Sequence, residues 1–115
     1  MLTFHQSCAS DQVCPQITSL IGEDMGSKIQ ITLTYCDRTP GSYQGFVYRF
    51  ALADSTGSEL PWNTTQSATQ SRACNTITAD LNNNYSAGEY QVRASVSNTD
   101  TGQETTGQSD GFTVG

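Results

Sequence analysis

Alternation between apolar and polar residues is strongest over positions 28–36. Ile29, Ile31, Leu33 and Tyr35 lie on one side of an extended chain there, and polar side chains occupy the positions between them. A period of two in β-branched and aromatic residues is typical of a strand that buries one face. The pattern predicts a half-buried central strand, against which the rest of the chain packs.

The same reasoning predicts further short strands separated by turn-forming residues. These strands cover residues 13–20, 46–52, 59–63, 73–81, 90–96 and 112–114. Residues 64–71 are interpreted as a polar linker, residues 98–109 as a polar loop, and no segment shows a helical period. About seven short strands of this kind predict an all-β fold, an antiparallel β-sandwich.

The pattern also predicts the domain organisation. Residues 1–12 show no periodicity before the first strand, so we expect a loose N-terminal arm there. Residues 13–115 then form a single domain, as the length of 115 residues indicates.

Four cysteines in a chain with a single lysine favour an extracellular protein with two disulfides. Cys8 and Cys14 suit a small loop closed by a disulfide, because a zinc site there would have only one histidine to draw on. Cys36 and Cys74 are expected to form the second bridge, on the outer face of its sheet.

The second bridge predicts a strand register. If Cys36 faces Cys74 across an antiparallel pair, Leu33 faces Ile77 and Ile31 faces Ala79. On the other face threonines meet threonines, and matched pairs of this kind stabilise a ladder. A slip of one residue would put the isoleucines opposite polar residues, so the parity of the pairing is well defined.

Charge excludes several classes of partner. Charged residues make up 14% of the chain, the net charge is −6, and the five basic residues never cluster. Nucleic acid is therefore not an expected partner. No apolar run approaches the roughly 20 residues that a membrane helix needs, so we expect no membrane insertion.

Catalytic residue types are poorly placed along the sequence. His5 lies in the expected arm, Lys28 begins an exposed strand edge, and the carboxylates fall almost entirely in turns. Nucleophilic catalysis needs a base beside its nucleophile, and glycoside hydrolysis needs two carboxylates across a cleft. We therefore expect no enzyme and no cofactor.

Some loop residues are candidates for binding or modification. Asn63 and Asn84 each begin an Asn-x-Ser/Thr sequon and predict a glycoprotein, although sequons also arise by chance in a chain rich in these residues. Tyr43, Trp62 and Tyr85 are candidates for stacking on a sugar. The alternative for Trp62 is packing over a core edge, the commoner fate of a lone tryptophan.

Calcium is the one metal for which the loop carboxylates are candidate ligands. Asp100, Glu104 and Asp110 would supply oxygen ligands if their loops met the Glu23-Asp24 turn at one end of the sandwich. The chain has no repeated Asp-x-Asn/Asp spacing, so solvated loop charges are the favoured interpretation.

Two stretches resemble immunoglobulin-like and fibronectin-type-III-like sandwiches. Residues 29–36 resemble strand B, and residues 88–94 resemble strand F, with Tyr90 at the position of the tyrosine corner. Val92 stands where true immunoglobulin domains have a cysteine, so the disulfide between strands B and F is absent. The spacing from Leu81 to Tyr90 is longer than in the fibronectin pattern.

Two further stretches resemble the Ser/Thr-rich β-sandwich domains of fungal cell-wall and GPI-anchored surface proteins. They are Ala87-Gly88-Glu89-Tyr90-Gln91-Val92-Arg93 and Phe112-Thr113-Val114. This resemblance implies a role in a wall or in adhesion, without catalysis.

Together these features predict a secreted or cell-surface module that mediates protein contacts, adhesion or wall structure. The alternative is a small carbohydrate-binding module, with or without calcium. The expected partner is a protein or glycan at a cell surface or wall, and an unpaired edge strand would allow self-association.

Overall fold

The computed structural model describes residues 3–6, 14–38, 44–58 and 60–115. These residues form eight strands: β1 (Thr3–Gln6), β2 (Gln16–Asp24), β3 (Lys28–Cys36), β4 (Gln44–Asp54), β5 (Thr64–Gln70), β6 (Cys74–Asn82), β7 (Gly88–Asn98) and β8 (Glu104–Val114). In the part of the chain described, no helix is long and apolar enough to cross a membrane.

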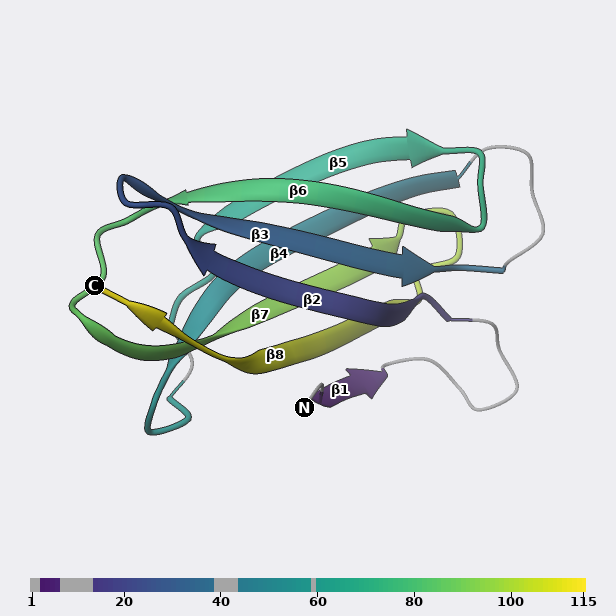
Figure 1. Cartoon of the computed structure of the whole chain (residues 1–115). Helices are drawn as coiled ribbons and strands as arrows, with labels where there is room; N and C mark the ends of the chain where they lie inside the picture. The colour runs from purple at the N-terminus through teal and green to yellow at the C-terminus, as the bar shows by residue number, and fades with distance from the viewer. Residues whose placement is uncertain (1–2, 7–13, 39–43, 59) are drawn as a thin grey trace.

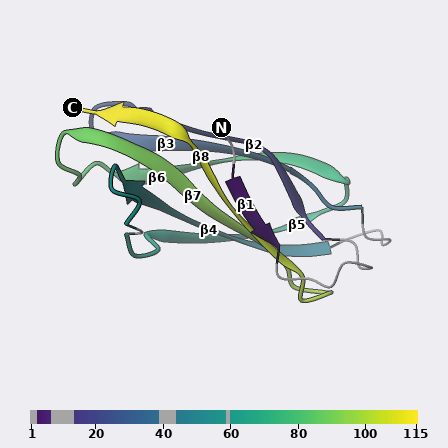
Figure 2. The same cartoon turned by 90° about the horizontal axis from the view of Figure 1, so that it is seen from below.

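The strands form two antiparallel sheets that lie face to face (Figure 1). One sheet has five strands in the order β1-β8-β7-β4-β5, and the other has three in the order β2-β3-β6. Figure 2 shows β1 beside β8, with which it pairs. The predicted all-β, antiparallel fold is confirmed.

The central strand is β3, and its predicted register with β6 is confirmed. Leu33 faces Ile77, Ile31 faces Ala79, and Cys36 faces Cys74. Thr34 and Thr76 meet on the outer face, where their hydroxyl oxygens lie 3.0 Å apart. The alternation of residues along β3 and β6 sets the parity of this pairing, as a half-buried strand requires, and the Cys36–Cys74 pair fits one register within that parity.

One of the two predicted disulfides is present. Cys36 and Cys74 are bonded on the outer face of the three-stranded sheet, as expected from their parity. The other predicted bridge, between Cys8 and Cys14, involves a residue outside the described ranges and stays a prediction.

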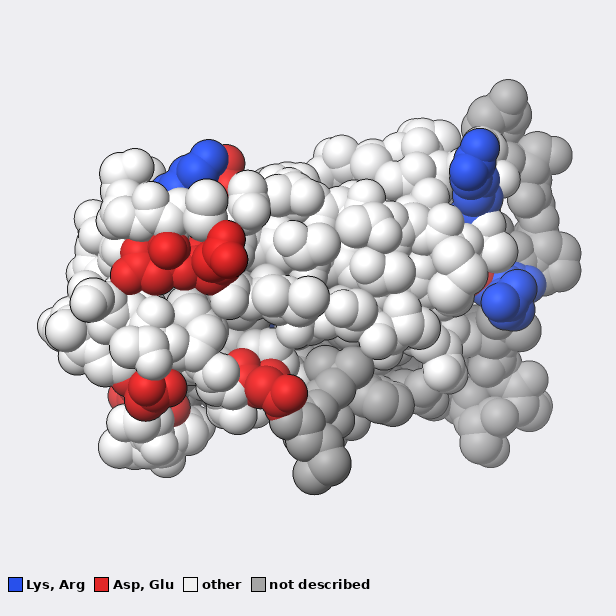
Figure 3. Space-filling model, in the orientation of Figure 1, with Lys and Arg blue, Asp and Glu red and all other residues white. Residues whose placement is uncertain are grey.

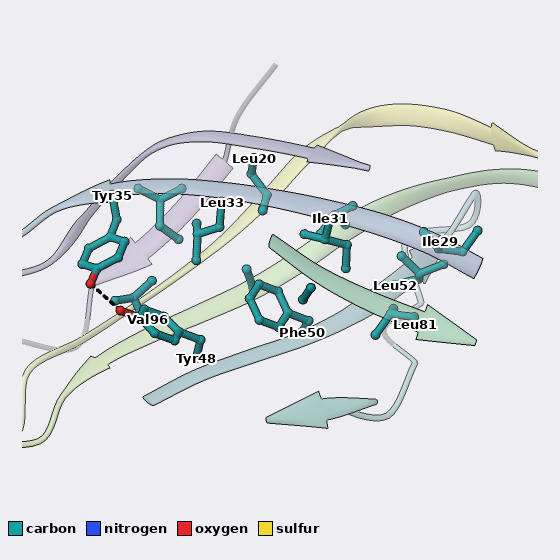
Figure 4. Close-up of a cluster of buried hydrophobic side chains, with 14 of the residues drawn as sticks. Leu20, Ile29, Ile31, Leu33, Tyr35, Tyr48, Phe50, Leu52, Leu81 and Val96 are labelled. Atoms are coloured by element: carbon teal, nitrogen blue, oxygen red, sulfur yellow. Dashed lines mark hydrogen bonds between the residues drawn. The ribbon is translucent and has the colours of Figure 1, made fainter. Parts of the chain in front are cut away.

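The core lies between the two sheets. Ile29, Ile31 and Leu33 of β3 project toward Phe50 and Leu52 of β4, and all five side chains are fully buried (Figure 4). Complete burial of an apolar side chain of this size stabilises a fold by about 1.5–3 kcal/mol. The pattern at 28–36 thus identifies the residues around which the sheets assemble.

A pair of tyrosines forms a polar contact inside this core. The Tyr35 and Tyr48 hydroxyls are hydrogen-bonded to each other, and their ring centroids lie 5.4 Å apart (Figure 4). Burial is the main cause that raises the pKa of Tyr35 well above its ordinary value of 10.0. The hydrogen bond with Tyr48 is the second cause. The Tyr35 phenol is therefore neutral at physiological pH.

The structure corrects two expectations around the tryptophan. Residues 64–71 were interpreted as a linker, but 64–70 form β5, an edge strand paired with β4. The expected strand at 59–63 is wrong, because Leu60–Asn63 is not a strand. Pro61 has no N–H to donate, and the segment bonds to β4 only at Leu60 and Asn63.

Two further segments expected to be irregular contain strands. Residues 104–109, assigned to a polar loop, belong to β8, which runs from Glu104 to Val114. Residues 3–6, assigned to the arm, form β1 at the edge of the five-stranded sheet. Both segments lack apolar alternation, so the sequence pattern gave no strand signal for either.

Tyr90 makes the contact that its position in the sequence implies. Its hydroxyl donates to the carbonyl oxygen of Ser86, four residues upstream, over 2.8 Å. A bond of this kind ties the entrance of a strand to the preceding loop, as the tyrosine corner does.

Candidate binding surface

Trp62 lies against two arginines on the outer face of the five-stranded sheet. The guanidinium carbons of Arg93 and Arg49 are 3.9 and 4.9 Å from the centroid of its ring. Arg93 is only 7% exposed and also donates to the carbonyl oxygen of Leu60. The indole is therefore held by cation–π contacts against the sheet, which favours the packing role over an open sugar platform.

Glu104 extends this cluster along β8. Its carboxylate lies 3.1 Å from Arg49 Nη2 and accepts a 2.7 Å hydrogen bond from the Ser97 hydroxyl. Burial opposes its ionisation, but the Ser97 and Ser95 hydroxyls and the Arg49 guanidinium outweigh that effect and lower the pKa of Glu104 below 4.5. Glu104 is therefore a charged partner of Arg49 at neutral pH.

The three carboxylates considered for calcium are engaged separately. Asp100 accepts a 3.0 Å bond from the Gly45 N–H, Glu104 pairs with Arg49, and Asp110 is exposed further along β8. Among the described residues, no three His, Cys, Asp or Glu side chains gather closely enough to hold a metal ion.

The two sequons lie close together. Asn63 and Asn84 are both exposed, and Asn63 Nδ2 donates to the Tyr85 hydroxyl over 2.7 Å. The Tyr85 ring packs edge-on against Tyr90, with centroids 5.6 Å apart. The Asn63–Tyr85 bond, which we call the latch, joins the start of β5 to the loop after β6. Tyr43 lies outside the described residues.

A shallow hollow of about 420 Å³ lies near the latch, at the turn after β4. Its lining includes the carboxylates of Asp54 and Glu89, the Tyr90 ring and Gly111. Two carboxylates beside an aromatic ring suit a hydroxyl-rich small molecule, and the volume falls within the range of ligand sites.

A nearly uncharged part of the surface is the side formed by the edge strands β5 and β6, which we call the open side. Among the described strands, β5 pairs only with β4, and β6 pairs only with β3. The two strands are joined at one end by residues 71–73 and at the other by the latch. Between these ends β5 projects past β6 (Figure 1).

The open side exposes one row of β5 residues that point toward the interior. The row consists of Thr64, Gln66, Ala68 and Gln70, of which the first three pair with the buried β4 residues Phe50, Tyr48 and Phe46. Gln66 is exposed although its β4 partner, Tyr48, is 1% exposed. The row, which we call the shelf, therefore extends beyond the three-stranded sheet.

Charge is nearly absent from the middle of the open side and of the adjoining three-stranded sheet. Figure 3 shows the three-stranded sheet from outside, with charged groups toward its two ends and an uncharged centre. β5 itself contains no charged residue, and along β6 the only charge is Asp80, which pairs with Lys28 over 3.3 Å. A surface of this kind suits hydrogen bonding and shape rather than ionic attraction.

Sequence reasoning missed the open side because its strand has no apolar pattern. The signal that was available is the β-branched threonine content of residues 64–70, in a run without glycine or proline. The chain matches no protein-family model and no curated protein sequence.

Proposed function

We propose that the chain is a non-catalytic, extracellular module that makes protein contacts at a cell surface or wall. The observation that carries this proposal is the open side, where two edge strands with a single charged residue, Asp80, each have one free edge on the same flank. Natural sheets normally blunt such edges with charge, proline, bulges or a covering segment. β5 has none of the first three devices within its seven residues.

The disulfide and the sequons support the extracellular part of the proposal. Cys74 is exposed, so the Cys36–Cys74 bridge lies within reach of solvent reductants and persists in an oxidising compartment. Asn63 and Asn84 are both exposed and thus accessible for glycosylation. The Cys8–Cys14 bridge, if formed, adds a second covalent link of the same kind.

The strand order supports the immunoglobulin-like resemblance. β2, β3 and β6 occupy the positions of strands A, B and E, and β4, β7 and β8 those of C, F and G. β5 lies beside the C position, where variable-type domains add a strand, and not beside E.

The resemblance to fungal wall domains gains a structural counterpart. Its two sequence runs lie in β7 and β8, where Tyr90 pairs with Phe112 and Gly88 with Val114. The runs therefore form one local unit of structure, which supports a wall or adhesion role.

Binding to displayed panels of extracellular proteins and glycans tests the proposal. We expect a protein ligand whose affinity falls at least about tenfold in Gln66→Lys. Thr78→Lys is the matched control, because it adds the same charge at an exposed position on the outer face of β6. Equal losses in both variants, or substrate turnover by the protein, would contradict the proposal.

Carbohydrate binding is the second candidate, favoured by the hollow at Asp54 and Glu89. A glycan ligand that tolerates Gln66→Lys but is lost in Glu89→Gln would support it. The same result would replace the protein-contact proposal, since the two sites use different residues.

A further inference from the structure

We infer that the free edge of β6 accepts one extended peptide strand from a partner protein, which lies over the shelf. The inference rests on the proposed function and names its mode of contact. Strand addition to an exposed sheet edge is a recurrent way of binding peptides, in which main-chain hydrogen bonds give affinity and side chains give specificity.

The difference between the two sheets creates the space. The three-stranded sheet ends at β6, while the five-stranded sheet continues past it by one strand, β5. A strand added to β6 would lie one strand spacing away, about 4.8 Å. It would cover the shelf as β6 covers β4, and would extend the three-stranded sheet by one strand.

Side-chain chemistry along the edge defines the occupant. Ile77 of β6 and Ala68 of β5 are partly exposed and pack against the core, so the centre of the site is weakly apolar. Gln66 and Thr64 make the adjoining shelf polar and uncharged. The matching strand alternates apolar and uncharged polar residues.

The end of β6 near the disulfide adds a charge. Arg72 is exposed in the link just before β6. An antiparallel strand would end beside it, so an acidic residue at the C-terminal end of the occupant would complement the site.

β6 of a second folded copy does not fit antiparallel against this edge. In that arrangement the five-stranded sheet of the copy would have to occupy the space already taken by the shelf. The site therefore favours a single extended strand over β6 of another copy.

An end-blocked synthetic peptide that copies residues 28–35 is a suitable probe. β6 already pairs with this sequence on its other edge, so its alternation matches β6. Hydrogen–deuterium exchange should show new protection in residues 75–81 and none in residues 64–70. A peptide of the same composition in scrambled order should give no protection.

Two adjacent substitutions on β5 form the matched pair for this test. Gln66 and Ser67 are both exposed, but Gln66 belongs to the shelf and Ser67 points to the opposite face. Gln66→Trp should weaken binding of the peptide at least about tenfold, and Ser67→Trp should leave it within about twofold. Unchanged melting temperatures would show that both variants are folded.

Several outcomes would overturn the inference. They are protection in β5 instead of β6, equal losses in the two variants, and no binding of the peptide. Protection of β6 that grows with protein concentration in the absence of peptide would assign the edge to a second copy. A panel ligand that still binds the Gln66→Trp variant would keep the proposed function and refute strand addition.

Discussion

The two flanks of this sandwich differ in how regularly their strands pair. On the flank where β2 packs against β8, which we call the closed side, the registers are irregular. β2 shifts register between Ile17 and Ser19, and β7 and β8 shift between Gln91 and Arg93. On the open side, β4 with β5 and β3 with β6 pair without any shift.

Side chains seal the closed side. The Thr105 hydroxyl donates to the Pro15 carbonyl oxygen, joining β8 to the start of β2. Ser109 Oγ accepts from the Val92 N–H and donates to the Asp110 carbonyl oxygen, which satisfies the backbone at the bulge. Bulges of this kind bend and twist a strand, and the local bonds satisfy the backbone groups that the bulge leaves unpaired. Beyond β8, the sheet continues by one short strand, β1.

Within the described residues, the open side is tied at its two ends, by residues 71–73 and by the latch. Between those points its strands pair with their neighbours without a register shift, and Asp80 is their only charged residue. The comparison indicates that register shifts occur where the two sheets close against each other, whereas pairing stays regular where another strand can be added.

The largest expected effect comes from removing the disulfide that holds the open edge. β6 has only one neighbouring strand, and the Cys36–Cys74 bridge spans 38 residues of sequence. The double variant Cys36→Ala/Cys74→Ala should lose about 3–4 kcal/mol of unfolding free energy, because the unfolded chain gains the loop entropy. Urea unfolding under non-reducing conditions measures this loss.

Hydrogen exchange sharpens the same prediction. In the double variant, β6 amides should lose more protection than β2 amides, since β2 is also held by β8. A loss of unfolding free energy below about 1 kcal/mol would show that the stability of the open edge does not depend on the disulfide. An equal loss of protection in β6 and β2 would show the same.

Overpacking the closed side should have the next largest effect. A Cβ added at Gly22 would clash with Val92 Cγ2 and would lie 2.8 Å from Phe112 Cε1. Gly22→Val should therefore cost about 2–3 kcal/mol in urea unfolding, as forced insertion into a packed interior does.

The open side provides the control for that substitution. Ser67→Val introduces the same side chain at an exposed edge position and should change stability by less than about 0.5 kcal/mol. If the two variants lost similar stability, the two flanks would not differ in packing as described.

The two flanks also differ in how far the sequence predicts them. β3 and β6 could be predicted to within a residue at their ends, because each buries one face of alternating apolar residues. The Leu33–Ile77 pairing also followed, because the expected Cys36–Cys74 bridge selected one register among those that keep the same parity. The end of β8 was predicted as a strand at 112–114, but its first half could not be, because the inward positions Thr105 and Ser109 are polar. Thr105 donates to Pro15 and Ser109 accepts from Val92, and no local pattern records partners so far away in the sequence.

The open side was hidden for a different reason. β5 is exposed on its outer face and only partly buried along the shelf, so neither face imposes an apolar period. Its role depends on which strand lies beside it, and that is a property of topology. The sequence pattern thus predicts elements that bury a face and misses those that the fold leaves uncovered.

A smaller effect is expected at the latch. Tyr85→Phe removes the hydrogen bond from Asn63 and should cost about 1 kcal/mol, the usual net value of one such bond. It should also raise hydrogen exchange at the start of β5. Tyr90→Phe is the control, because it removes the bond to Ser86 without touching the latch. Faster exchange at β5 in Tyr90→Phe but not in Tyr85→Phe would contradict the assignment.

The smallest expected effect is a change in acid sensitivity at the closed side. Asp24 accepts bonds from the N–H of Gly26, the N–H of Gly115 and the side chain of Asn83. The backbone bonds from Gly115 and Gly26 are the main cause that lowers the pKa of Asp24 below 3.8. A carboxylate with a lowered pKa stabilises the fold at pH values above its ordinary pKa. This stabilisation is lost as the pH falls through the pKa of the carboxylate in the folded state.

The melting temperature should therefore fall as the pH drops below about 3.8, and Asp24→Asn should flatten that fall. Asp54→Asn is the matched control: the pKa of Asp54 is also lowered, first by the Thr56 hydroxyl, but all its bonds lie within its own turn. A turn of that size can persist in the unfolded chain, which reduces its effect on stability. Asp24 joins three segments that separate on unfolding, so its variant should flatten the profile more. The reverse order would mean that the closed side is not tied through Asp24.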